Sequence, residues 1–241
     1  MAGHSKWKNI QHRKGAQDAK RGKAFTKIAV EIAVAAKQSG PDPETNPRLR
    51  TALSKARAAN MPKDNIQKAI KRGSGELDGV NYTEKDYEGY GPGGVAVYVE
   101  CLTDNINRTV SEVRHAFSRS GGNLGTDGSV GWMFNRKGMI VYLSEGLDFE
   151  KVFELALEHG AEDVVEDDGQ IEITCEVENF IALKEALDVL EKEAVFCELT
   201  RIPENRTAID ADKAASLEKL INVLEDNDDV QNVYHNGDFP D

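Results

Sequence analysis

The sequence is poor in cysteine and proline, with three cysteines and seven prolines in 241 residues. So few cysteines in a chain of this length exclude a disulfide-stapled secreted scaffold. The 21 glycines show no regular period, which excludes collagen-like and low-complexity classes. No apolar run approaches the roughly 18 residues of a membrane span, and the N-terminus lacks the apolar core of a signal peptide. We therefore expect a cytoplasmic protein with no membrane partner.

Motifs for catalysis and metal binding are also missing. The sequence contains no C-x-x-C, H-E-x-x-H, G-x-x-x-x-G-K-[ST] or G-x-S-x-G pattern. Residues 89–94 match G-x-G-x-x-G literally, but they precede a predicted strand instead of following one, so we interpret them as a rigid lead-in to the next domain. Cys101, Cys175 and Cys197 lie in apolar strand-like segments and are expected to be core thiols. We expect no enzyme activity, no cofactor and no metal site.

Charge, in contrast, is abundant and unevenly distributed. The formal net charge is −12, but residues 1–75 hold 17 basic and five acidic side chains, a net of +12. Residues 76–241 hold 13 basic and 37 acidic side chains, a net of −24. A solvated charged face is the ordinary explanation of a charge run. An excess over 75 residues instead favours a basic end that binds the phosphates of nucleic acid.

The basic end has the pattern of a small helical domain. Residues 1–23 lack an apolar stripe, which predicts an arm, and residues 24–38 have apolar side chains at helical spacing. Asn46 followed by Pro47 predicts an N-cap and first position of a second helix. A third helix is expected to run to about residue 72 with Gly73 as its C-terminal cap, before a linker over residues 73–93.

Beyond Gly94 the apolar period changes from that of helices to an alternation of strands and helices. Residues 138–202 predict the order β-α-β-β-α-β of a ferredoxin-like domain, with a hairpin turn at 167–169. On either side lies a half-unit: before it a strand from 95, a helix over 105–119 and a strand over 129–134; after it a strand over 205–209, a helix over 212–226 and a strand over 230–235.

These patterns predict an α+β fold in which a small N-terminal helical domain precedes two ferredoxin-like α/β domains, one inserted into the other. Two isolated half-units would leave sheet edges and helix faces unburied, which favours the insertion. The expected domains are residues 1–75, residues 76–134 together with 204–241, and residues 135–203.

The candidate nucleic-acid ligands are the basic side chains of the N-terminal domain. They are Lys6, Lys8, His12, Arg13, Lys14, Lys20, Arg21, Lys23 and Lys27, supported by Arg57, Lys68, Lys71 and Arg72. Trp7 lies between two lysines, and it either stacks on a base or anchors the arm by packing.

Several segments resemble the YebC/PmpR family. They are the opening M-A-G-H-S-K-W, the segment N-M-P-K-D-N-I at 60–66, Y-G-P-G-G at 90–94 and G-N-L-G at 122–125. The resemblance covers essentially the whole chain. It implies three domains, the first of them helical, and a role as a cytoplasmic DNA-binding transcriptional regulator. Relatives in the family also include mitochondrial translational activators and bacterial factors linked to relief of ribosome stalling.

Three hypotheses for the function therefore remain open. The first is a DNA-binding regulator of transcription that contacts promoter DNA through residues 1–75. The second is a ribosome-associated translation factor that uses the same basic surface on ribosomal RNA or tRNA. The third is a protein-interaction module whose working surface is the acidic ferredoxin-like domains. The basic charge alone does not decide between the first two, and the sequence specifies no oligomeric state.

Overall fold

The structure is a computed structural model that describes residue 7, residues 21–79 and residues 81–240, without the side chains of residues 21 and 22. The chain divides into two compact units. One, here called the main unit, comprises the described parts of residues 13–131 and 207–241. The other, the inserted unit, comprises residues 132–206 together with Trp7. A helical N-terminal region followed by antiparallel sheets confirms the predicted α+β class. The three domain boundaries given above stay a proposal.

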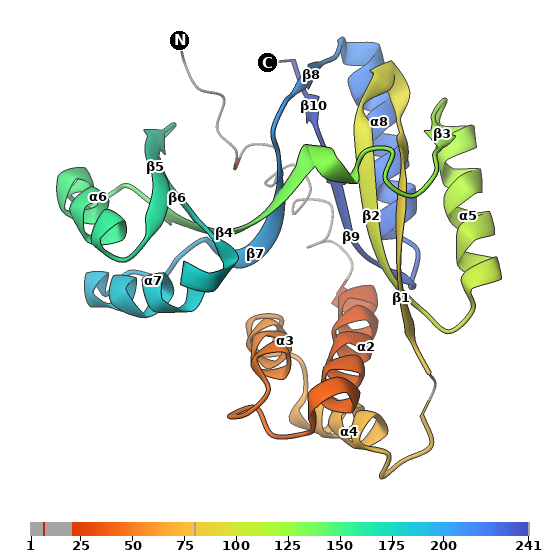
Figure 1. Cartoon of the computed structure of the whole chain (residues 1–241), viewed down its shortest axis with the longest axis horizontal. Helices are drawn as coiled ribbons and strands as arrows, with labels where there is room; N and C mark the ends of the chain where they lie inside the picture. Colours follow the sequence, from red (N-terminus) through yellow and green to blue (C-terminus); the bar gives the residue numbers. More distant parts are fainter. Residues whose placement is uncertain (1–6, 8–20, 80, 241) are drawn as a thin grey trace. The chain divides into compact units, whose positions relative to one another are not determined.

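Three helices form the start of the main unit (Figure 1): α2 (Arg21–Ser39), α3 (Pro47–Ala58) and α4 (Lys63–Ser74). Their apolar faces meet in one core that includes Ile32, Leu49 and Ala69. Asn46 caps α3 as predicted, because its side-chain oxygen accepts the Leu49 N–H at 3.0 Å. The Asn46 amide also donates to the Ala35 carbonyl at 2.8 Å, which ties α3 to α2.

The prediction that Gly73 ends α4 is wrong. The helix continues to Ser74 and is capped by Gly75, whose φ of 83° lies in the left-handed region. Gly73 instead lies where α4 passes α2, and a Cβ atom there would come within 2.3 Å of the Ala33 carbonyl oxygen. A glycine is needed at position 73 for close packing of the two helices and not for a turn. Near a helix end, the sequence alone does not distinguish a packing glycine from a capping glycine.

The main unit contains a four-stranded antiparallel sheet in the order β3-β1-β2-β9. Its strands are β1 (Thr83–Tyr90), β2 (Ala96–Thr103), β3 (Asn123–Leu124) and β9 (Val230–His235). The helices α5 (Ile106–Arg119) and α8 (Ala211–Glu225) cover one face and share its core (Figure 1). On the other face, Val30 and Val34 of α2 pack against Leu102, which joins the helical region to the sheet.

Two predictions for this region are wrong. Residues 83–90 form a strand instead of belonging to a linker, and residues 131–133 form a 3₁₀ turn, η2 (Gly131–Met133), instead of part of a strand. The Glu88 carboxylate accepts the backbone N–H groups of Gly128, Val130 and Gly131 at 2.6–2.8 Å. A side chain thus takes the place of a neighbouring strand and holds these residues as a loop.

The spatial order of this sheet is that of a ferredoxin-like domain with an altered chain order. Strand β2 leads through α5 to β3 as one β-α-β crossover, and α8 leads to β9, but the strand that precedes α8 in the chain lies outside this sheet. The strand between β2 and β3 in the sheet is β1, although β1 comes before β2 in the chain. The hairpin between β1 and β2 contains the short turn η1 (Pro92–Gly94), and a separate parallel pair joins β8 (Thr207–Ala208) to β10 (Gly237–Asp238).

The inserted unit has the predicted β-α-β-β-α-β order, with the strands arranged β5-β6-β4-β7 (Figure 1). Its elements are β4 (Phe134–Leu143), α6 (Phe149–Glu158), β5 (Ala161–Asp167), β6 (Gln170–Cys175), α7 (Phe180–Leu187) and β7 (Phe196–Pro203). Asp168 and Gly169 both have positive φ at the predicted hairpin turn, as a tight two-residue turn requires. Helices α6 and α7 cover one face of this sheet. The predicted helix over 179–193 is shorter, since the chain passes into the 3₁₀ turn η4 (Asp188–Leu190).

Candidate nucleic-acid interface

Helix α4 presents a row of cations on the face opposite its core. Ile66, Ala69 and Ile70 pack inward, whereas Lys68, Lys71 and Arg72 are exposed. The three cations are three and four residues apart, so they share one helix face. No hydrogen bond or ion pair engages them within the part of the chain that the structure describes. They are therefore available to a polyanion.

Helix α3 adds fewer available cations than its sequence suggests. The Arg48 guanidinium is ion-paired with Glu31 and Glu84, and these carboxylates raise its pKa above the ordinary value despite partial burial. Arg50 is exposed, but its guanidinium donates to the backbone carbonyls of Pro43 and Glu44. Arg57 is exposed near the end of the helix, and its guanidinium forms no hydrogen bond or ion pair with a described residue.

Two lysines predicted to bind phosphate have structural partners. The Lys23 and Lys27 ammonium groups each donate to a backbone carbonyl at the end of α8, those of Asp226 and Glu225, at 2.7 Å. Cations are favoured there because the last carbonyls of a helix carry partial negative charge. Burial lowers the pKa of Lys27, and the charge of Glu225 opposes that shift only in part. These lysines position α2 against the end of α8.

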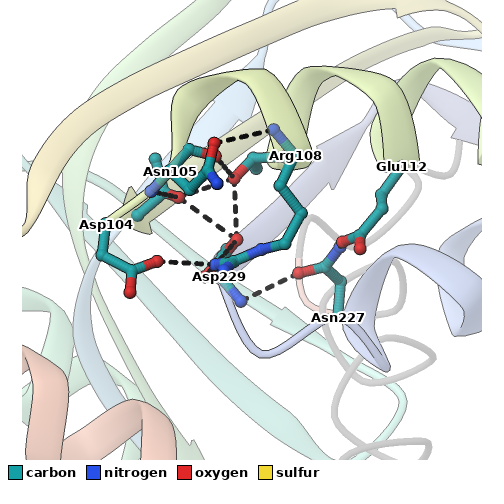
Figure 2. A network of polar contacts seen from close by, with 8 residues as sticks. Asp104, Asn105, Arg108, Glu112, Asn227 and Asp229 are labelled. Carbon is teal, nitrogen blue, oxygen red and sulfur yellow. Dashed lines mark hydrogen bonds and ion pairs between the residues drawn. The ribbon is translucent and has the colours of Figure 1, made fainter.

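A polar network around Asp229 was not predicted (Figure 2). Asp229, which follows α8, accepts hydrogen bonds from the Arg108 guanidinium at 2.7 Å, the Thr109 hydroxyl at 2.7 Å and the Thr103 hydroxyl at 3.2 Å. Arg108 also donates to Asp104 at 2.7 Å, and the hydrogen bonds to the two carboxylates raise its pKa. The network joins the start of α5 to the α8–β9 loop. In the sequence Asp229 is one of several acidic residues, and only the fold distinguishes it.

Trp7 is buried, with 5% of its surface exposed, and packs on Met139, Val141 and Phe196 of the inserted unit. Its ring centroid lies 5.0 Å from that of Phe196, and its backbone N–H donates to Glu172 at 3.2 Å. This burial corresponds to the packing alternative, and stacking of Trp7 on a base stays a prediction. The other predicted arm residues, Lys6, Lys8, His12, Arg13, Lys14 and Lys20, lie outside the described residues, and Arg21 is described only by its backbone at the start of α2.

Cys101 and Cys175 are buried core thiols as predicted, whereas Cys197 is only partly buried beside the core of the inserted unit. Burial raises the pKa of each thiol, that of Cys175 to about 11, and the structure contains no disulfide between them. Within the described ranges, no three His, Cys, Asp or Glu side chains are grouped so as to hold a metal ion. None of the helices described is long and apolar enough to cross a membrane.

We predict that these thiols resist modification at pH 8, because the thiolate is the reactive form and a raised pKa makes it scarce. A disulfide reagent should label the cysteines of the native protein slowly. In denaturant it should label all three cysteines rapidly. Rapid stoichiometric labelling of any cysteine in the native protein would contradict the assignment. As the pH rises from about 9 toward 11, unfolding should become easier, since the folded state retains the Cys175 proton that the unfolded state loses.

Comparison with known proteins places the whole chain in one group. Family models described as the TACO1/YebC N-terminal domain and the TACO1/YebC second and third domain match residues 5–76 and 82–237. A protein of Idiomarina loihiensis is 59% identical over all of this chain and 97% of its own length, and one of Syntrophotalea carbinolica is 58% identical with the same coverage. Both are named "Probable transcriptional regulatory protein". The crystal structure of a conserved hypothetical protein from Aquifex aeolicus is similar, with 47% identity, 93% coverage of each chain and a TM-score of 0.82.

Proposed function

Because the chain belongs to the TACO1/YebC family, we propose that it regulates gene expression by binding nucleic acid through its basic N-terminal region. The exposed row of Lys68, Lys71 and Arg72 carries this proposal. Arg57 and Lys63 extend the exposed charge of α3 and α4. Side chains of this kind contact phosphates and orient a protein on nucleic acid without reading its sequence. The acidic inserted unit, by contrast, would be repelled by the same polyanion.

We propose promoter DNA as the target, and the names of the relatives support this choice over a ribosomal one. The cytoplasm is the proposed location, because the relatives named above are bacterial and a bacterial chromosome lies in the cytoplasm. The proposed role is that of a regulator and not an enzyme. Direct reading of bases has little support, since Asn65 and Gln67 of α4 are two residues apart and so point about 160° away from each other.

The test is the salt dependence of binding, measured by fluorescence anisotropy with labelled duplex DNA and a labelled RNA hairpin. With Arg50 set aside because it donates to backbone carbonyls, the five other exposed cations of α3 and α4 predict a slope of log K against log[salt] of about −3.5 to −4.5, or steeper with the N-terminal arm. A flat dependence, or no binding of either probe, would overturn the proposal.

The ribosomal alternative is separated by sucrose-gradient fractionation of a lysate with and without nuclease. A transcriptional regulator should be absent from the ribosomal fractions and should protect promoter DNA from cleavage. Cosedimentation with ribosomes would instead favour the translation factor. Activity retained by a variant whose basic surface no longer binds nucleic acid would favour the protein-interaction module.

A further inference from the structure

The sheet of the inserted unit has two faces of different character. Ile140 and Tyr142 of β4 point toward α6 and α7, whereas Met139 and Val141 point to the opposite face, called here the helix-free face because neither α6 nor α7 covers it. The register places Val141 between Glu172 of β6 and Phe196 of β7. This helix-free face therefore has an apolar centre with a buried carboxylate beside it.

Trp7 covers that apolar centre. Its indole packs on Met139, Val141 and Phe196, and its backbone N–H donates to the Glu172 carboxylate. These contacts fix a residue more than 120 positions away in the chain from the sheet that it covers. The helix-free face thus holds Trp7 as a docked residue.

The electrostatics of the two partners are complementary. Trp7 is flanked in the sequence by Lys6 and Lys8. Besides Glu172, this sheet face carries two more acidic residues, Glu198 and Asp163. The register places Glu198 opposite Met139, and Asp163 opposite Thr174, which is itself paired with Met139. Residues 132–206 as a whole contain 7 basic and 19 acidic side chains. The positive charges that would attract a basic segment to a polyanion therefore also attract it to this acidic face.

The contact between Trp7 and the sheet also leaves buried hydrogen-bonding groups without partners among the described residues. The Trp7 indole N–H is buried and has no hydrogen-bond partner within the described part of the chain, and the buried Thr200 hydroxyl on β7 is in the same condition. An unpaired buried donor makes a contact less stable than the buried area alone suggests. A contact that combines apolar packing with an unpaired donor is suited to reversible release.

We propose that the helix-free face of the inserted unit is an autoinhibitory docking surface for the chain's own N-terminal segment. In the docked state Trp7 is buried on the apolar centre of a face that also carries acidic side chains. Nucleic acid competes with this acidic face for the same lysines, so binding releases Trp7. The inference rests on the proposed function, since it assumes that the basic N-terminal region binds nucleic acid.

The chain offers a direct probe because it contains only two tryptophans, Trp7 and the 65% exposed Trp132. In a Trp132→Phe background, Trp7 is the only tryptophan and its emission reports whether it is buried. We expect blue-shifted emission in the free protein and a red shift on addition of duplex DNA, at the concentration where anisotropy of the labelled duplex reports binding.

Two variants test the competition. Trp7→Ala removes the docked side chain, and Glu172→Gln retains the size of the acceptor but removes its charge. If the docked state holds nine-tenths of the molecules, Trp7→Ala should tighten duplex binding about tenfold, with a smaller gain for Glu172→Gln. Phe153→Ala, which truncates an exposed aromatic ring on α6, is the control and should leave the affinity unchanged.

The outcomes distinguish the two proposals. Duplex that binds while Trp7 emission stays blue-shifted, with unchanged or weaker binding by both variants, would overturn the docking inference and leave the proposed function intact. Absence of duplex and RNA binding by every form of the protein would overturn the proposed function and the inference with it.

Discussion

Replacing Lys68, Lys71 and Arg72 together by glutamine is expected to weaken duplex binding by about 100- to 500-fold at 0.1 M salt. Each phosphate contact that is lost removes the release of a condensed counterion, so the slope of log K against log[salt] should flatten by about 2 to 3. The three side chains are exposed on one face of α4 and make no contact with its core. The variant should therefore fold normally. Anisotropy titrations at several salt concentrations measure both quantities.

The matched control removes three positive charges from exposed positions elsewhere, Lys151, Lys184 and Lys219. Net charge changes equally in the two variants. If binding depends on overall charge, the two should lose the same affinity. If it depends on the α4 surface, the control should keep the wild-type slope and lose little affinity. Equal slopes for wild type and the α4 variant would remove α4 from the interface.

Asp229→Ala is expected to destabilise the main unit by about 3 kcal/mol. It removes the carboxylate that receives the Arg108 guanidinium and the Thr103 and Thr109 hydroxyl groups, and the two threonines are buried (Figure 2). Loss of a buried acceptor costs more than its hydrogen bonds contribute, because the remaining donors are left unsatisfied. The change in free energy of unfolding is measured by denaturant titration.

Two further variants sharpen this measurement. Asp229→Asn retains one acceptor oxygen and should cost less than alanine, whereas Asp78→Ala, at an exposed loop position, should have little effect. Hydrogen exchange should increase at the start of α5 and in the α8–β9 loop, and also at the start of α2, whose Lys23 and Lys27 bind the end of α8. Unchanged exchange at α2 would show that this network does not support the helical region.

Much of the fold follows from local patterns. The inserted unit was predictable because its strands alternate around apolar residues and its helices have one apolar face, and because Asp168 and Gly169 fit a tight turn. The β1 strand was not predictable in the same way. Its sequence, T-E-K-D-Y-E-G-Y, has few apolar residues, since its exposed positions are polar and Gly89 occupies a buried one. Its strand structure comes from pairing with β2 along its whole length.

The candidate interface was predictable in outline only. Charge density identified the N-terminal region, but it could not separate Lys68, which is exposed and available, from Lys27, which binds a carbonyl of α8. That difference depends on a contact across 198 positions of the chain. The role of Trp7 likewise depends on a sheet more than 120 residues away, so flanking lysines alone could not decide between packing and stacking.

The most direct test of the account is ultraviolet cross-linking of the full chain to duplex DNA, followed by mass spectrometry of the cross-linked peptides. We predict cross-links in the basic N-terminal region, including peptides of α3 and α4 around Arg57 and Lys68. The inserted unit, at residues 132–206, should give none above the level of a competitor control. Cross-links concentrated in the inserted unit, with none in residues 1–75, would contradict the claim that the basic end is the surface that binds nucleic acid.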